Sequence, residues 1–333
     1  MWQTLTMTIL VTGAAGQDGI LLSQLLTSYG LPVIALCRPS QSTYVQEMVP
    51  GLSTIPVDLR DFNRVNEILD ETRPTKIFNL AGFSSVRDSW HHPELTFQIN
   101  TELPKLMINW VKHASPETVF IQATSSEIFA ASTDSPQSEK SKIAPTSPYG
   151  ESKAQAHSFL TQMRDSENLK LMSVVLYNHE SPLRTPAFVT RHISRGIAKI
   201  VLGLTDTLPI GNVNSQRDWG WAPDYVRALW EISELDKPEN YVLSTGLLHT
   251  VGDLISFGFE SVEISNYKKF LVTDFERARK VDPQSLVGDS SYVKEKIGWE
   301  PTLTIKQVLA KMVLHDIRIL EHASGVKPFD WLD

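Results

Sequence analysis

The segment Thr12-Gly13-Ala14-Ala15-Gly16-Gln17-Asp18-Gly19 joins a short apolar run at Thr8–Val11 to a helical pattern of apolar residues, and it carries most of the information about the fold. Its three glycines permit a tight turn, close approach of a pyrophosphate to the backbone, and close packing of the following helix. The phosphates then lie at the positive end of that helix. The stretch therefore predicts a dinucleotide-binding turn. The alternative is a plain glycine-rich turn in an α/β core.

Strand-like and helix-like patterns alternate over the first 180 residues, which is typical of a parallel sheet covered on both faces. Strands are expected at Thr8–Val11, Pro32–Leu36, Thr54–Val57, Lys76–Leu80, Thr118–Ala123 and Leu171–Leu176. Helices are expected at Gly19–Tyr29, Asn63–Thr72, Pro93–His113 and Pro148–Ser166. We expect an α/β protein with a Rossmann-type doubly wound parallel sheet in residues 1–180. A smaller C-terminal α/β domain, residues 181–333, should mainly bind substrate, and later segments can cross back into the sheet.

The ends of three further strands suggest how a dinucleotide is bound. Arg38 and Ser40 follow the second strand, with no acid nearby in the sequence, and this favours the 2′-phosphate of NADP over the ribose diol of NAD. The alternative is that Arg38 is a surface charge. Asp58 and Leu59 follow the third strand, where such folds often hold the adenine. The run 79–82 follows the fourth and should lie against the phosphates and the nicotinamide.

Four residues suggest the chemistry. Tyr149 and Lys153 are four apart on a predicted helix and therefore lie on one face, where an ammonium would lower the pKa of the phenol. Ser125 and Glu127 follow the apolar run that is expected to form the fifth strand. Reversible oxidation of a hydroxyl requires only the serine, tyrosine and lysine. The additional carboxylate would serve an elimination, by taking a proton from the carbon next to the new ketone.

Composition limits the possible partners. The net charge of −7 argues against general binding of nucleic acid, and no apolar run is long enough for a membrane-spanning helix. The single cysteine, Cys37, excludes internal disulfides and fits a reducing, cytoplasmic setting. The pair His91-His92 lacks the spacing of metal ligands and is better interpreted as a helix entry, so no metal is expected.

The whole pattern resembles the GDP-mannose 4,6-dehydratases, members of the extended short-chain dehydrogenase/reductase class. The resemblance runs from about Ile9 to about Asp316. It rests on the glycine turn, on Ser125-Ser126-Glu127, on Ser147-Pro148-Tyr149-Gly150-x-x-Lys153, and on Asn178-His179-Glu180-Ser181-Pro182-x-Arg184. Also matching are Phe188-Val189-Thr190-Arg191, Arg217-Asp218-Trp219-Gly220 and Gly298-Trp299-Glu300-Pro301.

The resemblance implies a reaction and a role for each site residue. NADP takes hydride from C4 of a GDP-hexose, Glu127 removes the C5 proton, water leaves from C6, and hydride returns to C6. The catalytic residues implied are Ser125, Glu127, Tyr149 and Lys153. The cofactor residues expected are Gly13, Gly16, Gln17, Asp18, Gly19, Arg38, Asp58, Leu59, Leu80, Ala81, Gly82, Ser84, Lys153, His179 and Arg184. The substrate residues expected are Ser126, Asn178, Val189, Arg191, His192, Arg217 and Arg277.

The chain departs from the family pattern in several places. Pro39 stands where a second arginine is expected, and this weakens the preference for NADP. Phe83-Ser84-Ser85 replaces Gln-Ser-His, and His192 replaces a lysine, so both the sugar and the base stay open. The alternatives are a 4,6-dehydratase of another nucleotide sugar, such as GDP-N-acetylglucosamine, an NADPH-dependent reductase or epimerase of 4-keto sugars, or an idle cofactor sensor.

The resemblance also implies self-association. Helices at Pro93–His113 and Pro148–Ser166 would pair with their copies in a homodimer, or in a homotetramer built from dimers. The apolar residues of the first helix exceed a single stripe, which is consistent with a second buried face. Those residues are Leu103, Leu106, Met107, Ile108 and Trp110.

Overall fold

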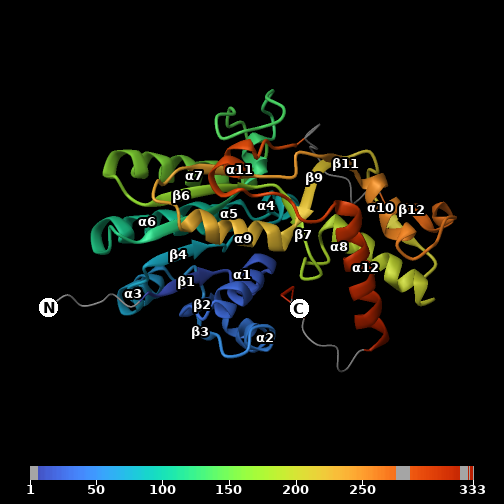
Figure 1. Cartoon of the computed structure of the whole chain (residues 1–333), viewed down its shortest axis with the longest axis horizontal. Helices are drawn as coiled ribbons and strands as arrows, with labels where there is room; N and C mark the ends of the chain where they lie inside the picture. Colours follow the sequence, from blue (N-terminus) through green and yellow to red (C-terminus); the bar gives the residue numbers. More distant parts are fainter. Residues whose placement is uncertain (1–6, 275–285, 323–328, 330, 333) are drawn as a thin grey trace.

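The computed structural model describes residues 7–274, 286–322, 329 and 331–332. Its centre is a parallel sheet of seven strands in the order β10-β6-β5-β4-β1-β2-β3 (Figure 1). The strands are β1 (Ile9–Thr12), β2 (Val33–Cys37), β3 (Ser53–Pro56), β4 (Lys76–Asn79), β5 (Val119–Ser125), β6 (Leu171–Leu176) and β10 (Asn240–Leu243). The expected Rossmann-type sheet is confirmed. Because β10 pairs with β6, the sheet also includes a strand from beyond residue 180.

Helices cover both faces of this sheet, and the alternation of side chains along each strand determines which helix each face contacts. Ile9 and Val11 belong to one buried core, together with residues of α1 (Gln17–Ser28) and α9 (Ala222–Ser233). Leu10, between them in sequence, belongs to a second core, formed with α3 (Phe62–Thr72), α6 (Leu103–Ala114) and α7 (Pro148–Glu167). Strands buried on both faces explain why these runs are continuously apolar.

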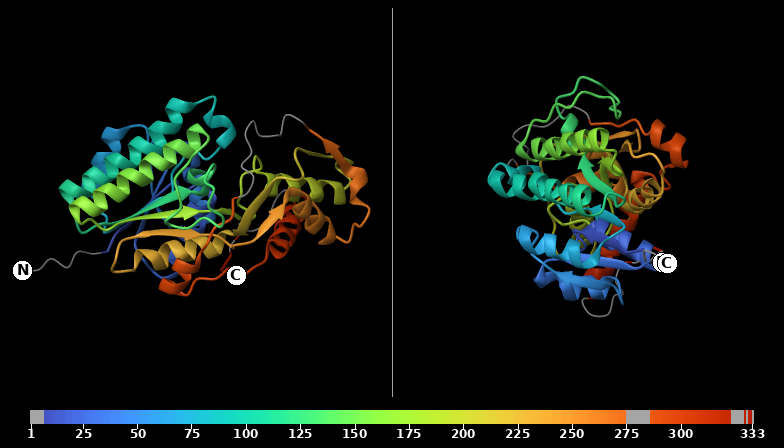
Figure 2. Two further views of the ribbon diagram at one scale, coloured as in Figure 1. Left: turned by 90° about the horizontal axis from the view of Figure 1, so that it is seen from above. Right: turned by 90° about the vertical axis from the view of Figure 1, so that its left-hand side faces the viewer.

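The rest of the chain forms a smaller part beside the sheet (Figure 2). Its strands are β7 (Asn178–Glu180), β9 (Gln216–Trp221) and β11 (Leu248–Thr250) in one sheet, and β8 (Leu208–Ile210) and β12 (Leu271–Thr273) in another. Its helices α8 (Val189–Val201), α10 (Val251–Glu260) and α12 (Ile305–Glu321) share one apolar core. The remaining helices are α2 (Ser42–Met48), α4 (Val86–Ser89), α5 (Pro93–Phe97) and α11 (Ser291–Ile297).

The helix expected at Pro93–His113 is divided. A π-helical turn, Gln98–Glu102, separates α5 from α6, and Pro104 follows in the first turn of α6. Proline has no backbone N–H and clashes with the preceding turn, which accounts for a local change of helical pitch here. The apolar residues attributed above to a second buried face are otherwise explained. Four of them, Leu103, Met107, Ile108 and Trp110, are buried in the core of the chain itself.

No helix in the described part of the chain is both long enough and apolar enough to span a membrane.

Candidate active site

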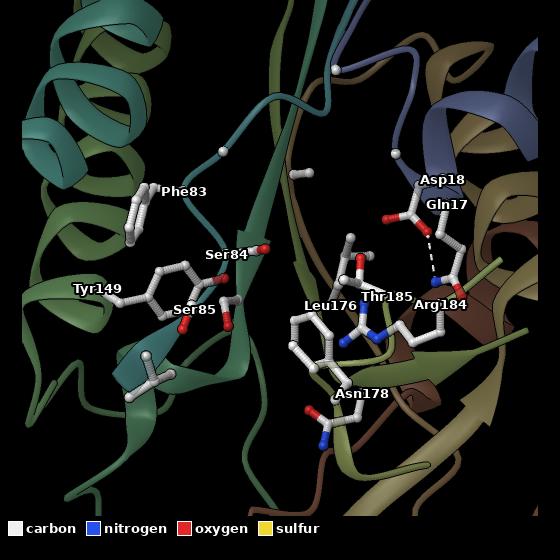
Figure 3. Close-up of a pocket in the computed structure, with 18 of the residues that line it drawn as sticks. Gln17, Asp18, Phe83, Ser84, Ser85, Tyr149, Leu176, Asn178, Arg184 and Thr185 are labelled. Carbon is white, nitrogen blue, oxygen red and sulfur yellow. Dashed lines mark hydrogen bonds between the residues drawn. The ribbon is translucent and has the colours of Figure 1, made fainter. Parts of the chain in front are cut away.

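A cavity of about 1140 Å³ lies at the carboxyl ends of the sheet strands, bordered by both parts of the chain. Open α/β sheets bind ligands at this edge. Figure 3 shows Tyr149 on one side with Phe83, Ser84 and Ser85, and Asp18, Arg184 and Asn178 across from them. The volume of the cavity exceeds the upper end of the range for pockets of drug-sized ligands, which is about 1,000 Å³. All the catalytic residues and all the cofactor residues expected from the sequence line it.

The glycine turn forms a cradle that side chains would fill. Gly13 has a φ of +66°, and a Cβ there would lie 2.8 Å from the Ala81 nitrogen. A Cβ on Gly19 would lie 2.4 Å from the Gly13 carbonyl oxygen, so α1 can approach the turn only because this position is glycine. The first turn of α1, which has no side-chain cap, faces the cavity. These features fit the pyrophosphate of a dinucleotide.

An ion pair connects the glycine turn to the smaller part. His179 Nε2 lies 3.0 Å from the Asp18 carboxylate, and the ring stacks on Tyr225 with 4.7 Å between centroids. Gln17 reinforces the pair, since its amide nitrogen donates to Asp18 at 3.1 Å and to the His179 carbonyl at 3.0 Å. The two expected cofactor residues His179 and Arg184 therefore lie beside the start of α1, and both line the cavity.

Ser125, Glu127 and Tyr149 meet at the end of β5. Ser125 caps a short 3₁₀ turn at Ser126–Phe129 by accepting from the Glu127 amide at 3.3 Å, and it also hydrogen-bonds the Tyr149 side chain. Ser147 caps α7 by accepting from the Gly150 amide at 3.1 Å. A Cβ on Gly150 would lie only 2.7 Å from the Glu127 carbonyl oxygen. This glycine, which the sequence analysis did not single out as a site residue, allows the tyrosine helix to contact the carboxylate turn.

The predicted lowering of the Tyr149 pKa by Lys153 is not found. Burial raises the pKa of Tyr149, the charge of Glu127 acts in the same direction, and the Ser125 hydrogen bond and Arg184 only partly offset them. The Lys153 ammonium instead donates to the Ala123 carbonyl at 2.8 Å. Burial lowers the pKa of Lys153 itself to about 8. Both side chains are therefore affected more by desolvation than by one another.

A buried chain of hydrogen bonds runs beneath the cavity across three strands. Thr12 donates to Asn79 at 2.6 Å, Asn79 donates to Gln122 at 2.8 Å, and Gln122 donates to the Ala123 carbonyl at 2.9 Å. That carbonyl also accepts from Lys153, and the Thr12 hydroxyl accepts from the Ala81 amide at 3.1 Å. This series of hydrogen bonds therefore connects Lys153 to the backbone beside the glycine turn.

Two charged residues that are distant in sequence meet at the end of the cavity formed by β2 and β3. Arg38 has no acid nearby in the sequence, but Asp58 lies close enough in space for the Arg38 charge to help lower the pKa of Asp58. The reason is that β2 and β3 are parallel neighbours, with Cys37 opposite Pro56, so their carboxyl ends meet. Asp58 is held by Arg60, a third charged residue lining the cavity that the sequence analysis did not select.

The expected substrate residues divide into three groups. Asn178, Val189, His192 and Arg217 line the cavity. Ser126 and Arg191 do not: Ser126 is buried in its turn, and Arg191 is buried in an ion pair with Asp316 of α12. The packing of α8 against α12 turns the Arg191 side chain toward α12. Arg277 lies outside the described residues.

Neighbouring residues complete the cavity wall. Asn100, from the π-helical turn, binds both backbone groups of Phe83, accepting at 2.8 Å and donating at 3.1 Å, and it donates to Ser152 at 3.0 Å. It thereby holds the segment that places Phe83 beside Tyr149. A buried asparagine next to an interruption of the helix is the signal that could have identified Asn100 as a residue supporting the site. Among described residues, no group of three or more His, Cys, Asp or Glu could hold a metal ion.

Comparison with known proteins agrees with this geometry. The sequence matches the family described as GDP-mannose 4,6 dehydratase over residues 10–312. It is 31% identical to the GDP-mannose 4,6-dehydratase of Vibrio cholerae, covering 96% of each chain. The fold is similar to UDP-glucose 4-epimerase of Thermus thermophilus, solved with NAD, at a TM-score of 0.80 and 23% identity, covering 93% of this chain and 99% of that one. RMD of Pseudomonas aeruginosa, solved with NADPH, gives a TM-score of 0.79 at 22% identity, covering 94% and 99%. The chain belongs to the GDP-mannose 4,6-dehydratase family.

Proposed function

We propose that this protein is an NADP-dependent hydro-lyase that converts GDP-D-mannose to GDP-4-keto-6-deoxy-D-mannose. The observation that carries the proposal is that Glu127 shares one cavity with Ser125, Tyr149, Lys153 and the glycine turn. A reductase, or an epimerase that moves only hydride at C4, has no need of a base at this position, whereas an elimination requires one. The name of the Vibrio cholerae relative supports the same substrate.

An oxidised nicotinamide, when bound, would supply this site with a positive charge and with an acceptor for the C4 hydride that is later returned to C6. Tyr149 takes the C4 hydroxyl proton, helped by that charge, which opposes the effect of burial on its pKa. Ser125 hydrogen-bonds the C4 oxygen. Glu127 removes the C5 proton, which the C4 ketone has made acidic, and gives it to the hydroxyl that leaves C6 as water. C5 then regains a proton from solvent, to which Tyr149 returns the proton that it took from the C4 hydroxyl.

The residues around this centre would hold the two nucleotides. Lys153 would bind the nicotinamide ribose, and the cradle of Gly13, Gly16 and Gly19 would take the pyrophosphate. Asn178 and Arg217 would face the substrate diphosphate, since a guanidinium fork matches phosphate oxygens. Arg277, which lies outside the described residues, and Ser126, which is buried in its turn, remain proposed substrate residues. For Arg191 the proposed role is only to support the packing of α8.

A second nucleotide sugar is favoured by one observation. Phe83 lines the cavity beside Tyr149, where the family pattern has a glutamine, and it presents an apolar ring to the reacting sugar (Figure 3). The Phe83 ring would contact the methyl group of an N-acetyl substituent as well as it would contact a hydroxyl-bearing edge of the sugar. The alternative substrate is therefore a GDP-N-acetylhexosamine, converted by the same chemistry.

The test is incubation of purified protein with GDP-mannose and NADP in D₂O, followed by mass spectrometry and NMR. A product that lacks one water and has a C6 methyl, a C4 ketone and solvent deuterium at C5 is expected. Glu127→Gln should abolish water loss and deuterium uptake while cofactor binding is retained. A parallel incubation with NADPH and a 4-keto sugar nucleotide would instead identify a reductase if NADPH is oxidised and no water is lost. Turnover only with GDP-N-acetylglucosamine would establish the second substrate.

A further inference from the structure

Three charged side chains gather where the adenosine of the proposed cofactor would lie, and one of them has no assigned role. Arg38 follows β2, and Asp58 and Arg60 follow β3. The Val57 amide donates to the Cys37 carbonyl at 2.8 Å, so the two strands are paired up to these residues. All three side chains line the cavity.

Arg60 forms an ion pair with the Asp58 carboxylate through two of its guanidinium nitrogens. Its Nε lies 2.9 Å from Oδ1 and 3.0 Å from Oδ2, and Nη2 also binds Oδ2. The Arg60 amide adds a donor to Oδ1 at 3.0 Å. Both oxygens of Asp58 are therefore already engaged. In NAD enzymes the acid that accepts the ribose hydroxyls follows the second strand, where this chain has Arg38. Asp58, with both oxygens engaged, is poorly placed to take over that task.

The pair contributes little to stability, because its side chains are 56% and 44% exposed. Exposed ion pairs contribute between about 0 and 1 kcal/mol. Its effect is on local charge. A 2′-phosphate carries about −1.5 to −2 charges at neutral pH, and an unpaired carboxylate beside it would repel it. Two guanidiniums and one carboxylate leave one net positive charge, whereas without Arg60 that charge is cancelled.

We propose that Arg60 determines the choice of NADP over NAD by neutralising Asp58 next to the 2′-phosphate that Arg38 binds. This inference rests on the proposed function, since it assumes that the cavity takes a dinucleotide with Arg38 at its adenosine end. Pro39 stands where the family pattern has a second arginine. Arg60, which follows the neighbouring strand β3, offsets the Asp58 charge, so that the positive charge of Arg38 is not cancelled.

The test compares dissociation constants of NADP and NAD, measured by calorimetry on the full chain. The variants are Arg60→Gln, the double variant Arg60→Gln with Asp58→Asn, and Arg64→Gln. Arg64, on α3, pairs with Glu67 and Glu71 and does not line the cavity, so it is a matched control. Arg60→Gln should lower the ratio of NADP affinity to NAD affinity on the order of tenfold. Removing the Asp58 charge should restore most of that ratio, and Arg64→Gln should leave it unchanged.

An unchanged ratio in Arg60→Gln, or no recovery in the double variant, would overturn the inference. A wild-type protein that binds NADP and NAD equally would overturn the NADP assignment together with it. Neither result affects the dehydratase assay, which follows water loss from the sugar nucleotide with whichever cofactor binds. Thermal unfolding of each variant shows whether it has folded.

Discussion

His179 Nε2 lies 3.0 Å from the Asp18 carboxylate, although 161 residues separate the two in sequence. The other ring nitrogen, Nδ1, lies 2.6 Å from the Tyr177 carbonyl oxygen. Both partners accept hydrogen bonds, so both ring nitrogens donate and His179 is an imidazolium. A buried cation from β7 is thereby fixed to the first turn of α1, next to the glycine turn. The two parts of the chain are tied together at the edge of the cofactor site.

This pair predicts a pH dependence of stability. Burial opposes both charges, and their mutual attraction outweighs it, so the pKa of Asp18 falls to about 2 and that of His179 rises above 6.5. The Asp18 contribution is present above its ordinary pKa of 3.8 and is lost as the pH falls toward 2. The His179 contribution is complete below pH 6.5 and is lost as the pH rises through its folded-state pKa.

Asp18→Asn should therefore lower the free energy of unfolding by about 1–3 kcal/mol, and most strongly in the window between those ordinary values. The measurement is denaturant unfolding from pH 3 to pH 9, together with NMR of the His179 ring, whose pKa should fall in the variant. A difference from wild type that stays constant across this range would contradict an ionic pair.

Gly19→Ala should impair both folding and cofactor binding. The new Cβ would lie 2.4 Å from the Gly13 carbonyl oxygen, so α1 must move away from the turn. Overpacking of this kind costs about 1–3 kcal/mol. Calorimetry with NADP and thermal unfolding measure the two effects. Gly30→Ala is the control: Gly30 has a φ of +70° with nothing near its Cβ, so only backbone strain is added and cofactor affinity should persist.

Gly150→Ala should slow the elimination while leaving the cofactor bound. A Cβ at this position would lie 2.7 Å from the Glu127 carbonyl oxygen and would push the carboxylate turn away from Tyr149. A displacement of about 1 Å in an active site can reduce the rate about a hundredfold. The readouts are kcat and deuterium uptake at C5. Gln155→Ala, at an exposed position one turn further along α7, should change neither. A normal kcat in Gly150→Ala would show that the contact is dispensable.

The buried hydrogen bonds that link Thr12, Asn79 and Gln122 below the cavity should be energetically coupled. Asn79→Leu leaves the Thr12 hydroxyl hydrogen without its acceptor and the Gln122 amide oxygen without its donor. Gln122→Leu leaves the Asn79 amide nitrogen without its acceptor, at about 1–3 kcal/mol for each buried group. The double variant removes both sides of one bond, so it should cost less than the sum of the two single variants. Urea unfolding of all three variants measures this coupling. Strict additivity would mean that the amides act separately.

Asp316→Asn should destabilise the protein without weakening either nucleotide. Arg191 and Asp316 are 9% and 2% exposed in their side chains, so the variant leaves a buried guanidinium without its counter-charge. Breaking a buried pair in this way costs about 3–5 kcal/mol. The affinities for NADP and GDP-mannose should match wild type, since neither residue lines the cavity. Selective loss of GDP-mannose binding would return Arg191 to the substrate site.

Local patterns in the sequence were sufficient for much of the architecture. The strand expected at Leu171–Leu176 has the same bounds in the structure, and α7 begins with Ser147 and Pro148 as cap and first residue. Glycine spacing, caps and apolar runs act through residues close together in the chain, so a sequence carries their consequences directly. The same holds for the family signature, whose motifs contain the residues that the structure brings into one cavity.

Tertiary structure alone decided which charges meet. The register of β2 and β3 brings Asp58 and Arg60 beside Arg38, and the packing of α8 against α12 takes Arg191 out of the cavity. The pKa values of Tyr149 and Lys153 likewise depend on burial more than on their spacing along one helix. Coulomb energies and desolvation are determined by distances in space, and pairs far apart in sequence leave no periodic trace. The sequence determined the sheet, the turn and the candidate catalytic residues, while only the folded chain determined their charge environment.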